Sequence, residues 1–341
     1  MKKISVFRFS ALGDVAMTYP VLKVLTETHP GVQVQLVSRP FFEPVFRHLK
    51  NVKFFPARVD KTYKGITGLY KLFKELKQEN PDFIADLHDV LRTKVLRLFF
   101  RMNGTPVYVI DKGRTEKKRL VQKPLAESQP LKTTHERYAD VFRSAGLDVD
   151  LSRFRPEKPE LDNQIQLFLS PFEGTKIIGV APLARHTGKQ YPLGGTKEAI
   201  KLMLKNNRDI IVMLFGAPAE RKVLDAVNPD PGRVFNLSGM FSFEGELQII
   251  SRLNVMLSMD SGNGHLAANF GVPVVTVWGV THPYAGFAPL GQTSEQQILP
   301  DTEKFPMLPC SVYGNKICQG YETIWDDILP EQIAETVLKQ L

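Results

Sequence analysis

The stretch that decides the fold spans residues 255–277 and reads V-M-L-S-M-D-S-G-N-G-H-L-A-A-N-F-G-V-P-V-V-T-V. Residues 255–258 form an apolar run typical of a buried strand, and a Gly-rich turn follows it. A helix is expected from Asn263, and residues 272–277 form a second apolar run. A strand, a helix and a strand in this order predict a βαβ unit with parallel strands.

The same alternation extends in both directions along the chain. In the second half, strands are expected at 176–181, 209–215 and 233–236, with helices around 197–205, 219–226 and 244–252. In the first half, strands are expected at 3–9, 32–38, 51–56, 83–87 and 106–110, with helices at 15–27, 68–80, 89–100 and 134–145. The pattern predicts two open, parallel α/β sheets.

A linker is expected within residues 148–173, where R-P-E-K-P-E-L-D carries two prolines and mixed charge. The predicted domains are 1–155 and 156–341, and the last helix could pack back on the first domain. Two Rossmann-like domains of this kind are expected to face each other across a cleft, with ligands outside the carboxyl ends of the strands. Residues 112–137 are polar and basic and predict a long loop, which is usually functional or mobile.

Composition agrees with a globular protein of two domains, since 43% of the 341 residues are apolar and 23% are charged. A membrane-spanning helix needs about 20 apolar residues, and the most apolar run, 272–280, is shorter. Arg8 and Asp14 interrupt the N-terminal stretch, so no signal peptide is expected. Two cysteines fit a reducing compartment, which favours a cytoplasmic location.

Charge is divided unevenly along the chain. Residues 1–155 hold 29 Lys and Arg against 16 Asp and Glu, whereas residues 156–341 hold 15 against 20. A basic first half favours an anionic partner there: a nucleic acid, a phosphorylated substrate or an anionic membrane surface. The alternative is a merely soluble, positive surface. No known nucleic-acid-binding motif is present, so nucleic acid is not expected as a partner.

The first candidate motif is R-F-S-A-L-G-D at residues 8–14, between an expected strand and an expected helix. Gly13 permits a tight turn. Asp14 falls at the helix start, where it is either a helix cap or a general base. The spacing does not match the Gly-x-Gly-x-x-Gly pattern of dinucleotide binding.

Two further motifs follow strands of the second half. Arg185, His186 and Lys189 cluster in a glycine-containing loop that suits a diphosphate, although it could also be a solvated basic loop. Gly216 and Glu220 lie at the next turn. Glu220 could accept hydrogen bonds from ribose hydroxyls, or could serve only the helix dipole.

The fourth motif, M-D-S-G-N-G-H-L-A-A at residues 259–268, carries the most information. A strand ends and a helix begins there, so backbone N–H groups form an anion site. Ser261 adds a hydroxyl and Asp260 could hold sugar hydroxyls. His265 lies in the first helical turn, where it either contacts a phosphate or is a satisfied structural residue.

Taken together, these motifs resemble glycosyltransferase family 9, the ADP-heptose:lipopolysaccharide heptosyltransferases. The resemblance rests on R-F-S-A-L-G-D-V-A-M-T-Y-P at 8–20, K-Q-Y-P at 189–192, D-S-G-N-G-H-L-A-A-N-F-G-V-P-V-V-T-V-W-G at 260–279 and V-T-H-P at 280–283. It runs over nearly the whole chain. It implies a GT-B fold and an inverting reaction that needs neither a metal nor a cofactor.

Residue roles are carried over from the same resemblance. Asp14 matches the general base and Lys189 the lysine that neutralises the donor diphosphate. The donor-binding residues implied or inferred are Arg185, Gly216, Glu220, Phe241, Asp260, Ser261, Gly262 and His265. Ser10 and Gly13 are assigned to the acceptor. Ala184 and Arg185 depart from the small hydroxyl residues that the family usually has there, and Arg185 could substitute as a phosphate ligand.

The partners implied are ADP-heptose, a phosphorylated glycolipid acceptor and an anionic membrane surface, at the inner face of the inner membrane. The alternatives are a transferase that uses another nucleotide sugar, and a nucleotide-sugar epimerase. P-C-S-V-Y-G-N-K-I-C at 309–318 resembles a cysteine-bearing tail of some members and is interpreted as structural or as a redox-labile pair, rather than as a metal site.

Overall fold

The computed structural model describes residues 1–341, and the chain folds as two compact units. The first unit comprises residues 1–112 and 134–155, and the second comprises residues 113–133 and 156–341. The basic segment 113–133 therefore packs with the second unit, although its place in the sequence had assigned it to the first domain.

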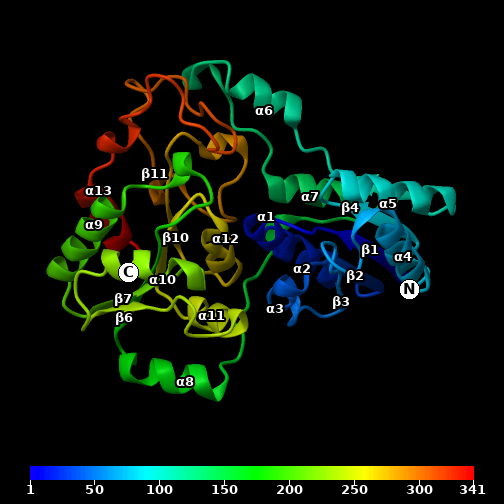
Figure 1. The fold of residues 1–341 in the computed structure, drawn as a ribbon, viewed down its shortest axis with the longest axis horizontal. Helices are drawn as coiled ribbons and strands as arrows, with labels where there is room; N and C mark the ends of the chain where they lie inside the picture. The colour runs from blue at the N-terminus through cyan, green and yellow to red at the C-terminus, as the bar shows by residue number, and fades with distance from the viewer. The chain divides into compact units, whose positions relative to one another are not determined.

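A five-stranded parallel sheet with the order β3-β2-β1-β4-β5 forms the centre of the first unit (Figure 1). The strands are β1 (Lys2–Phe7), β2 (Val32–Ser38), β3 (Val52–Pro56), β4 (Phe83–Asp86) and β5 (Val107–Val109). The α-helices are α1 (Leu12–Ala16), α2 (Thr18–Thr28), α3 (Glu43–Phe46), α4 (Gly65–Lys77), α5 (Leu91–Met102) and α7 (Thr134–Arg143), and the 3-10 turns are η1 (Pro40–Phe42) and η3 (Leu151–Arg153).

Apolar spacing explains how α4 and α5 cover one face of this sheet. Leu69, Leu72 and Leu76 recur at helical spacing in α4 and are buried against Phe7 and Phe100. This cluster is the core of that face.

A single helix expected over 15–27 is instead two helices, α1 and α2, which meet at Met17. Pro20 accounts for the break. Proline lacks the backbone N–H that a continuous helix would use at this position, and its ring clashes with the carbonyl four residues earlier.

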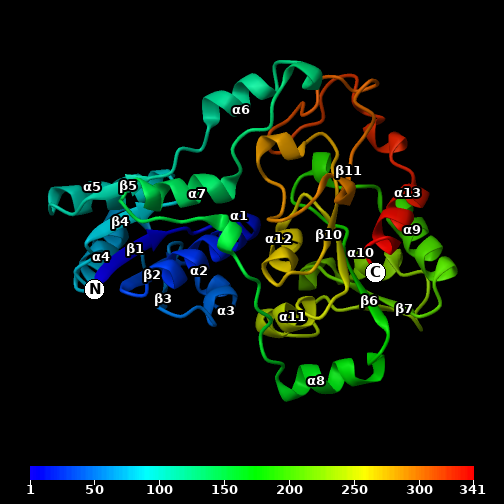
Figure 2. The same cartoon turned by 180° about the vertical axis from the view of Figure 1, so that it is seen from behind.

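A six-stranded parallel sheet with the order β11-β10-β9-β6-β7-β8 forms the centre of the second unit. The strands are β6 (Lys176–Ala181), β7 (Ile210–Leu214), β8 (Val234–Asn236), β9 (Val255–Met259), β10 (Val274–Val277) and β11 (Gln297–Ile298). The α-helices are α6 (Arg114–Leu120), α8 (Asn163–Leu169), α9 (Leu193–Asn206), α10 (Arg221–Val227), α11 (Phe243–Ile250), α12 (Gly262–Asn269) and α13 (Pro330–Leu338), and Figure 2 shows them from behind. Short 3-10 turns are η2 (Leu125–Glu127), η4 (Ser170–Phe172), η5 (Thr187–Lys189), η6 (Pro218–Glu220), η7 (Pro283–Ala285), η8 (Ser294–Gln296) and η9 (Ile324–Asp327).

The strand order reverses at one point in each sheet. In the first unit the first strand, β1, lies beside β4, and in the second unit the first strand, β6, lies beside β9. Ligands of open α/β sheets bind at the carboxyl ends of the strands at such a point. Ligand-binding and catalytic residues are therefore expected in the loops after β1 and β4 and in those after β6 and β9.

The last helix, α13, packs against α9 within the second unit and buries Ile333, Ala334 and Val337. No helix in the structure combines the length and the apolar character that crossing a membrane requires.

Candidate active site

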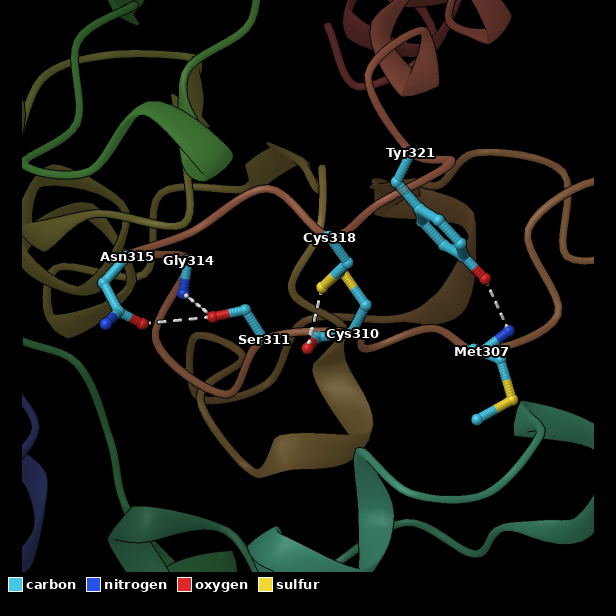
Figure 3. Close-up of a disulfide and its surroundings, with 7 residues drawn as sticks. All are labelled: Met307, Cys310, Ser311, Gly314, Asn315, Cys318 and Tyr321. Carbon is cyan, nitrogen blue, oxygen red and sulfur yellow. Dashed lines mark hydrogen bonds between the residues drawn. A yellow bond between two sulfur atoms is a disulfide. The ribbon is translucent and has the colours of Figure 1, made fainter.

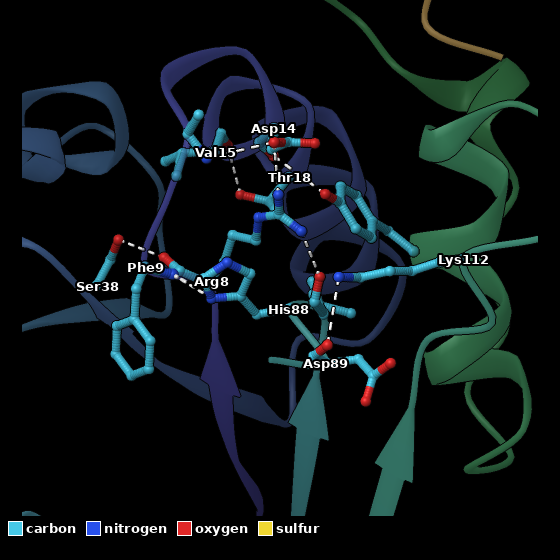
Figure 4. Close-up of polar contacts among 12 residues, drawn as sticks. Arg8, Phe9, Asp14, Val15, Thr18, Ser38, His88, Asp89 and Lys112 are labelled. Atoms are coloured by element: carbon cyan, nitrogen blue, oxygen red, sulfur yellow. Dashed lines mark hydrogen bonds and ion pairs between the residues drawn. The ribbon is translucent and has the colours of Figure 1, made fainter. Parts of the chain in front are cut away.

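Asp14 lies in the first turn of α1, where Arg8 orients its carboxylate (Figure 4). Arg8 Nη2 lies 2.6 Å from Asp14 Oδ2, and the same oxygen accepts a 3.3 Å hydrogen bond from the Ala11 backbone N–H. The Arg8 side chain is 6% exposed and that of Asp14 is 33% exposed. Asp14 thus supports the helix start and still presents part of its carboxylate to solvent, so the two roles considered for it are compatible.

The loop after β4 holds Arg8 in place. Arg8 Nη1 donates a 2.8 Å hydrogen bond to the Leu87 carbonyl, and the guanidinium lies 5.7 Å from the ring centroid of Tyr138. The Tyr138 hydroxyl donates a 3.3 Å hydrogen bond to the backbone carbonyl of Asp14. Burial and the positive charge of Arg8 lower the pKa of His88 to about 3, so this ring is neutral near pH 7.

His88 and Tyr138 belong to no motif, and sequence reasoning did not select them. The one available signal for His88 is its position, since it follows a buried strand at the carboxyl end. Ser10 is half-buried in the turn after β1, and Gly13 lies in the first turn of α1 rather than in the turn itself. Both residues are close in sequence to Asp14, and nothing further distinguishes them.

In the second unit, the loops after β6 and β9 bring Lys189 and Asp260 together. Lys189 Nζ lies 2.7 Å from Asp260 Oδ2, and the two side chains are 15% and 5% exposed. The residues are far apart in sequence, and they meet because β6 and β9 are parallel neighbours. The structure therefore joins two of the predicted site residues into one buried ion pair.

Ser261 stands at the N-cap of α12 without acting as a cap. Its side chain accepts no capping hydrogen bond, and its Oγ is buried with no hydrogen-bond partner in the protein. The first backbone N–H groups of a helix also lack intrahelical partners. Together these groups give an N-terminal anion site next to the ion pair. Gly262 opens α12, and His265 is buried one turn further along.

A disulfide between Cys310 and Cys318 closes a loop (Figure 3), and Gly314 of this loop packs against Lys189. Within this loop, the Gly314 carbonyl accepts a 3.2 Å hydrogen bond from the Gly188 backbone N–H. Gly314 has a φ of +67°, and a Cβ atom there would lie 2.5 Å from Lys189 Cγ. Only glycine fits this close approach, so the disulfide loop supports the stem of Lys189.

The basic segment 113–133 also reaches this region of the second unit. Lys117, on α6, is buried, and its Nζ lies 4.2 Å from the ring centroid of Phe287. Lys189 Nζ lies 5.9 Å from the same centroid. Further along, the Leu131 backbone N–H donates a 2.9 Å hydrogen bond to the Tyr284 carbonyl. The segment predicted as a long loop thus contains a helix that brings a second cation to the same ring as Lys189.

The other residues predicted to bind the donor differ in the contacts that they make within the protein. Arg185 is exposed and forms no ion pair. Glu220 Oε2 accepts a 2.6 Å hydrogen bond from the Ala217 backbone N–H, which is the helix-start role that sequence reasoning had considered for it. Gly216 leaves room for that carboxylate, since a Cβ atom there would lie 2.9 Å from Glu220 Oε2. Phe241 is half-buried, with its ring centroid 4.9 Å from that of Phe168.

Thr281 and His282 belong to the V-T-H-P motif at 280–283, but the sequence analysis gave them no role in the site. The preceding residue, Val280, donates a 3.1 Å backbone hydrogen bond to the Gly188 carbonyl. Thr281 Oγ1 is buried without a partner. Burial lowers the pKa of His282 to about 4, and its Nδ1 accepts a 3.1 Å hydrogen bond from the Tyr284 N–H. Their signal in the sequence was that motif, which follows an apolar strand.

Comparison with known proteins decides the family. The model of glycosyltransferase family 9 (heptosyltransferase) matches residues 69–311, which is well over half of the chain. The chain belongs to this family. It is therefore a glycosyltransferase, and the resemblance drawn from the motifs is confirmed.

Relatives of this family 9 glycosyltransferase match it over most of its length. Lipopolysaccharide heptosyltransferase 1 of Pseudomonas aeruginosa is 24% identical over 321 residues, which cover 90% of this chain and 86% of that protein. A glycosyl transferase family 9 crystal structure from Veillonella parvula has a TM-score of 0.78 at 19% identity and covers 99% and 97% of the two chains. Escherichia coli heptosyltransferase WaaC, solved with ADP-2-deoxy-2-fluoro heptose, has a TM-score of 0.65 at 19% identity and covers both chains fully. The predicted GT-B class of fold, with two parallel α/β sheets, is confirmed.

Proposed function

We propose that this family 9 glycosyltransferase is an inverting enzyme that transfers a heptose from ADP-heptose to the lipopolysaccharide inner core without a metal ion. The observation that carries the proposal is the cluster of Lys189, Asp260 and the unpartnered Ser261 hydroxyl at the switch point of the second sheet. The name of the Pseudomonas relative supports the acceptor, and the ligand of the WaaC structure supports the donor.

The second unit is proposed to bind the ADP-sugar. When ADP leaves, negative charge develops on the β-phosphate, and fixed positive groups there stabilise the transition state. Lys189 has three ammonium protons, of which one faces Asp260, so others remain for phosphate oxygens. Ser261 Oγ and the N-terminus of α12 supply further donors. Gly262 and His265 belong to the same donor loop. Arg185, Gly216, Glu220 and Phe241 are proposed to contact the remainder of the donor.

The first unit is proposed to bind the acceptor and to supply the base. Asp14 accepts the proton of the acceptor hydroxyl while that oxygen attacks the anomeric carbon on the face opposite the leaving ADP. Arg8 and the Ala11 N–H both bind Asp14 Oδ2, so the carboxylate is held in one orientation. Ser10 and Gly13 are proposed to lie against the acceptor. A phosphorylated glycolipid suits the excess of Lys and Arg in this half of the chain. The enzyme would meet it at the cytoplasmic face of the membrane.

A thermal-shift panel with ADP, UDP, GDP, CDP and their sugars tests the donor. A ligand that binds only the folded state raises the melting temperature by mass action, by an amount equivalent to about 2.7 kcal/mol at 100 times its Kd. We expect an ADP-selective shift that Lys189→Ala reduces. Lys205→Ala, which changes an exposed lysine of α9, is the matched control and should keep the full shift. A UDP- or GDP-selective shift would replace ADP-heptose by another nucleotide sugar.

Ser261→Ala tests whether the Ser261 hydroxyl binds the ligand or only stabilises the fold. A serine that caps a helix contributes about 1 kcal/mol to stability, but the Ser261 hydroxyl makes no capping bond. We therefore expect unchanged stability without ligand and an ADP affinity lowered about tenfold, as for a lost hydrogen bond to a charged group. Product analysis with a heptose-deficient lipopolysaccharide acceptor completes the test. ADP-heptose turnover that needs no acceptor would instead support an epimerase or a hydrolase.

A further inference from the structure

Five large apolar side chains are exposed on α4 and α5. The exposed fractions are 69% for Ile66, 46% for Tyr70, 79% for Leu91, 55% for Leu98 and 78% for Met102. Scattered exposed apolar residues need no explanation, but a contiguous exposed apolar patch marks an interaction site.

Helical spacing and ring contacts join them. Leu91, Leu98 and Met102 are separated by seven and four residues, which places them on one face of α5. Ile66 and Tyr70 are four apart on α4. The Tyr70 ring lies 5.4 Å from that of Phe99 on α5, and the two helices lie side by side in both ribbon views (Figures 1 and 2). The five residues thus form an apolar surface on a pair of packed helices.

Positive charge surrounds this apolar surface. Lys71, Lys74 and Lys77 on α4, and Lys94 and Arg101 on α5, are exposed and form no ion pair. α5 contains no acidic residue, and the one carboxylate of α4, Glu75, accepts a hydrogen bond from the Tyr63 hydroxyl. The ammonium of Lys74 lies 5.0 Å from the Tyr70 ring centroid, so charge and apolar surface are directly adjacent.

We propose that the α4–α5 surface docks on an anionic lipid bilayer, with Leu91, Leu98 and Met102 inserted at the headgroup boundary. The inference rests on the proposed function, because that function places the acceptor in a membrane. Apolar side chains on one face with Lys and Arg beside them define helices that lie in a membrane interface. Excess basic charge matches anionic headgroups, whereas a protein partner for this surface would need a complementary acidic face.

The proposal predicts how salt acts on binding. Purely electrostatic attachment disappears at high ionic strength, because charges beyond a Debye length are screened. Insertion of apolar side chains does not depend on salt in this way. Binding to anionic vesicles should therefore weaken with salt but retain a resistant part, and the apolar residues should carry that part.

Co-sedimentation of the full chain with vesicles tests the surface. Phosphatidylcholine vesicles containing phosphatidylglycerol are compared with pure phosphatidylcholine vesicles, at low and high salt. We expect wild-type binding to be stronger to the anionic vesicles at low salt, and the salt-resistant part of the binding to persist on both vesicle compositions. The triple variant Leu91→Ser, Leu98→Ser, Met102→Ser should lose the salt-resistant part, with affinity lowered at least tenfold. The affinity of the double variant Lys94→Gln, Arg101→Gln for anionic vesicles at low salt should fall by about fivefold for each cation removed.

Matched controls lie on the second unit. Leu167→Ser with Val223→Ser changes two exposed apolar residues, and Lys205→Gln with Lys222→Gln changes two exposed lysines. Both controls should bind vesicles as the wild type does. Equal vesicle binding by the α4–α5 variants and the wild type, or no wild-type binding, would overturn the proposal. The ADP thermal shift and transfer to a deacylated acceptor are measured on the same variants, so failure of the heptosyltransferase proposal is seen separately.

Discussion

Asp14 and Arg8 show how one residue pair can serve both folding and chemistry. The carboxylate supports the start of α1 through the Ala11 N–H and neutralises the buried Arg8. A variant that removes the carboxylate altogether would leave a buried charge unpaired and destabilise the chain. The informative substitution is therefore one that removes the basic carboxylate but keeps a hydrogen-bond acceptor for Arg8 and Ala11.

Asp14→Asn is that substitution. Its amide oxygen can still accept from Arg8 and Ala11, but it cannot take a proton from the acceptor hydroxyl. We expect kcat for heptose transfer to fall by about 10²- to 10⁴-fold, with ADP affinity unchanged. Steady-state kinetics and calorimetric titration with ADP measure the two quantities. Asp111→Asn, which changes an exposed carboxylate of the same unit, should leave both intact. Transfer at the wild-type rate in Asp14→Asn would exclude Asp14 as the base.

Glu246 provides a prediction of pH dependence. Burial in α11 raises the pKa of Glu246 to about 7 from its ordinary 4.5. The folded chain therefore holds this proton more tightly than the unfolded chain, so stability falls as pH rises from about 4.5 through 7. Glu246→Gln should match the wild type near pH 4.5 and be more stable above pH 7. Because the side chain is partly solvated, we expect the free energy of unfolding of Glu246→Gln to exceed that of the wild type by about 1–2 kcal/mol above pH 7.

Urea unfolding of both proteins at acid and neutral pH measures this difference. Glu295→Gln, at an exposed position, serves as the control and should show no pH-dependent gain. If Glu246→Gln gained no stability above pH 7, the carboxylate would be better solvated than its burial indicates.

At the scale of elements, the sequence predicted strands and ligand loops better than helix ends. The β6 loop and the turn after β9 were both selected from composition, and the sheet register brings Lys189 to Asp260. Residues 112–137 were predicted as a loop because few apolar positions recur there, yet α6 forms within them. Its buried residues, Lys117 and Leu120, include a lysine whose packing on Phe287 no apolar periodicity could indicate.

The role of Cys310 and Cys318 was left open by the sequence, and the structure pairs them. A disulfide that joins residues eight apart restricts the unfolded chain, and this loss of entropy stabilises the folded state by about 2.5 kcal/mol. The double variant Cys310→Ser, Cys318→Ser should therefore lower the free energy of unfolding by about that amount. It should also weaken ADP binding several-fold, because the loop supports Lys189 through Gly188 and Gly314.

Denaturant unfolding and calorimetric titration with ADP check the two effects. Adding a dithiol reductant to the wild type should reproduce both, and the double variant should not respond to it. An unchanged ADP affinity in the double variant would show that Lys189 holds its position without the disulfide.

At the scale of the whole molecule, assignment of residues 113–133 to the second unit changes the charge division. The first unit then holds 23 Lys and Arg against 14 Asp and Glu, and the second holds 21 against 22. The strongly basic unit is the one that carries Asp14 and the α4–α5 surface. The basic first unit is the one proposed to bind the anionic glycolipid and the membrane. The second unit, proposed to bind the donor, is close to neutral.

Hydrogen exchange of the full chain with and without ADP tests this division. A ligand slows exchange of amides whose opening requires its release, within the cooperative unit that binds it. We expect protection at residues 182–192 and 258–266, and also at 113–133, because the latter pack with the second unit. Residues 1–112 should exchange as they do without ADP, and Lys189→Ala should reduce the protection throughout. Protection confined to 1–112 would place the nucleotide on the first unit and overturn the assignment of Lys189, Asp260 and Ser261 to the donor. Protection of 182–192 and 258–266 without 113–133 would keep the donor site and show that α6 opens independently of it.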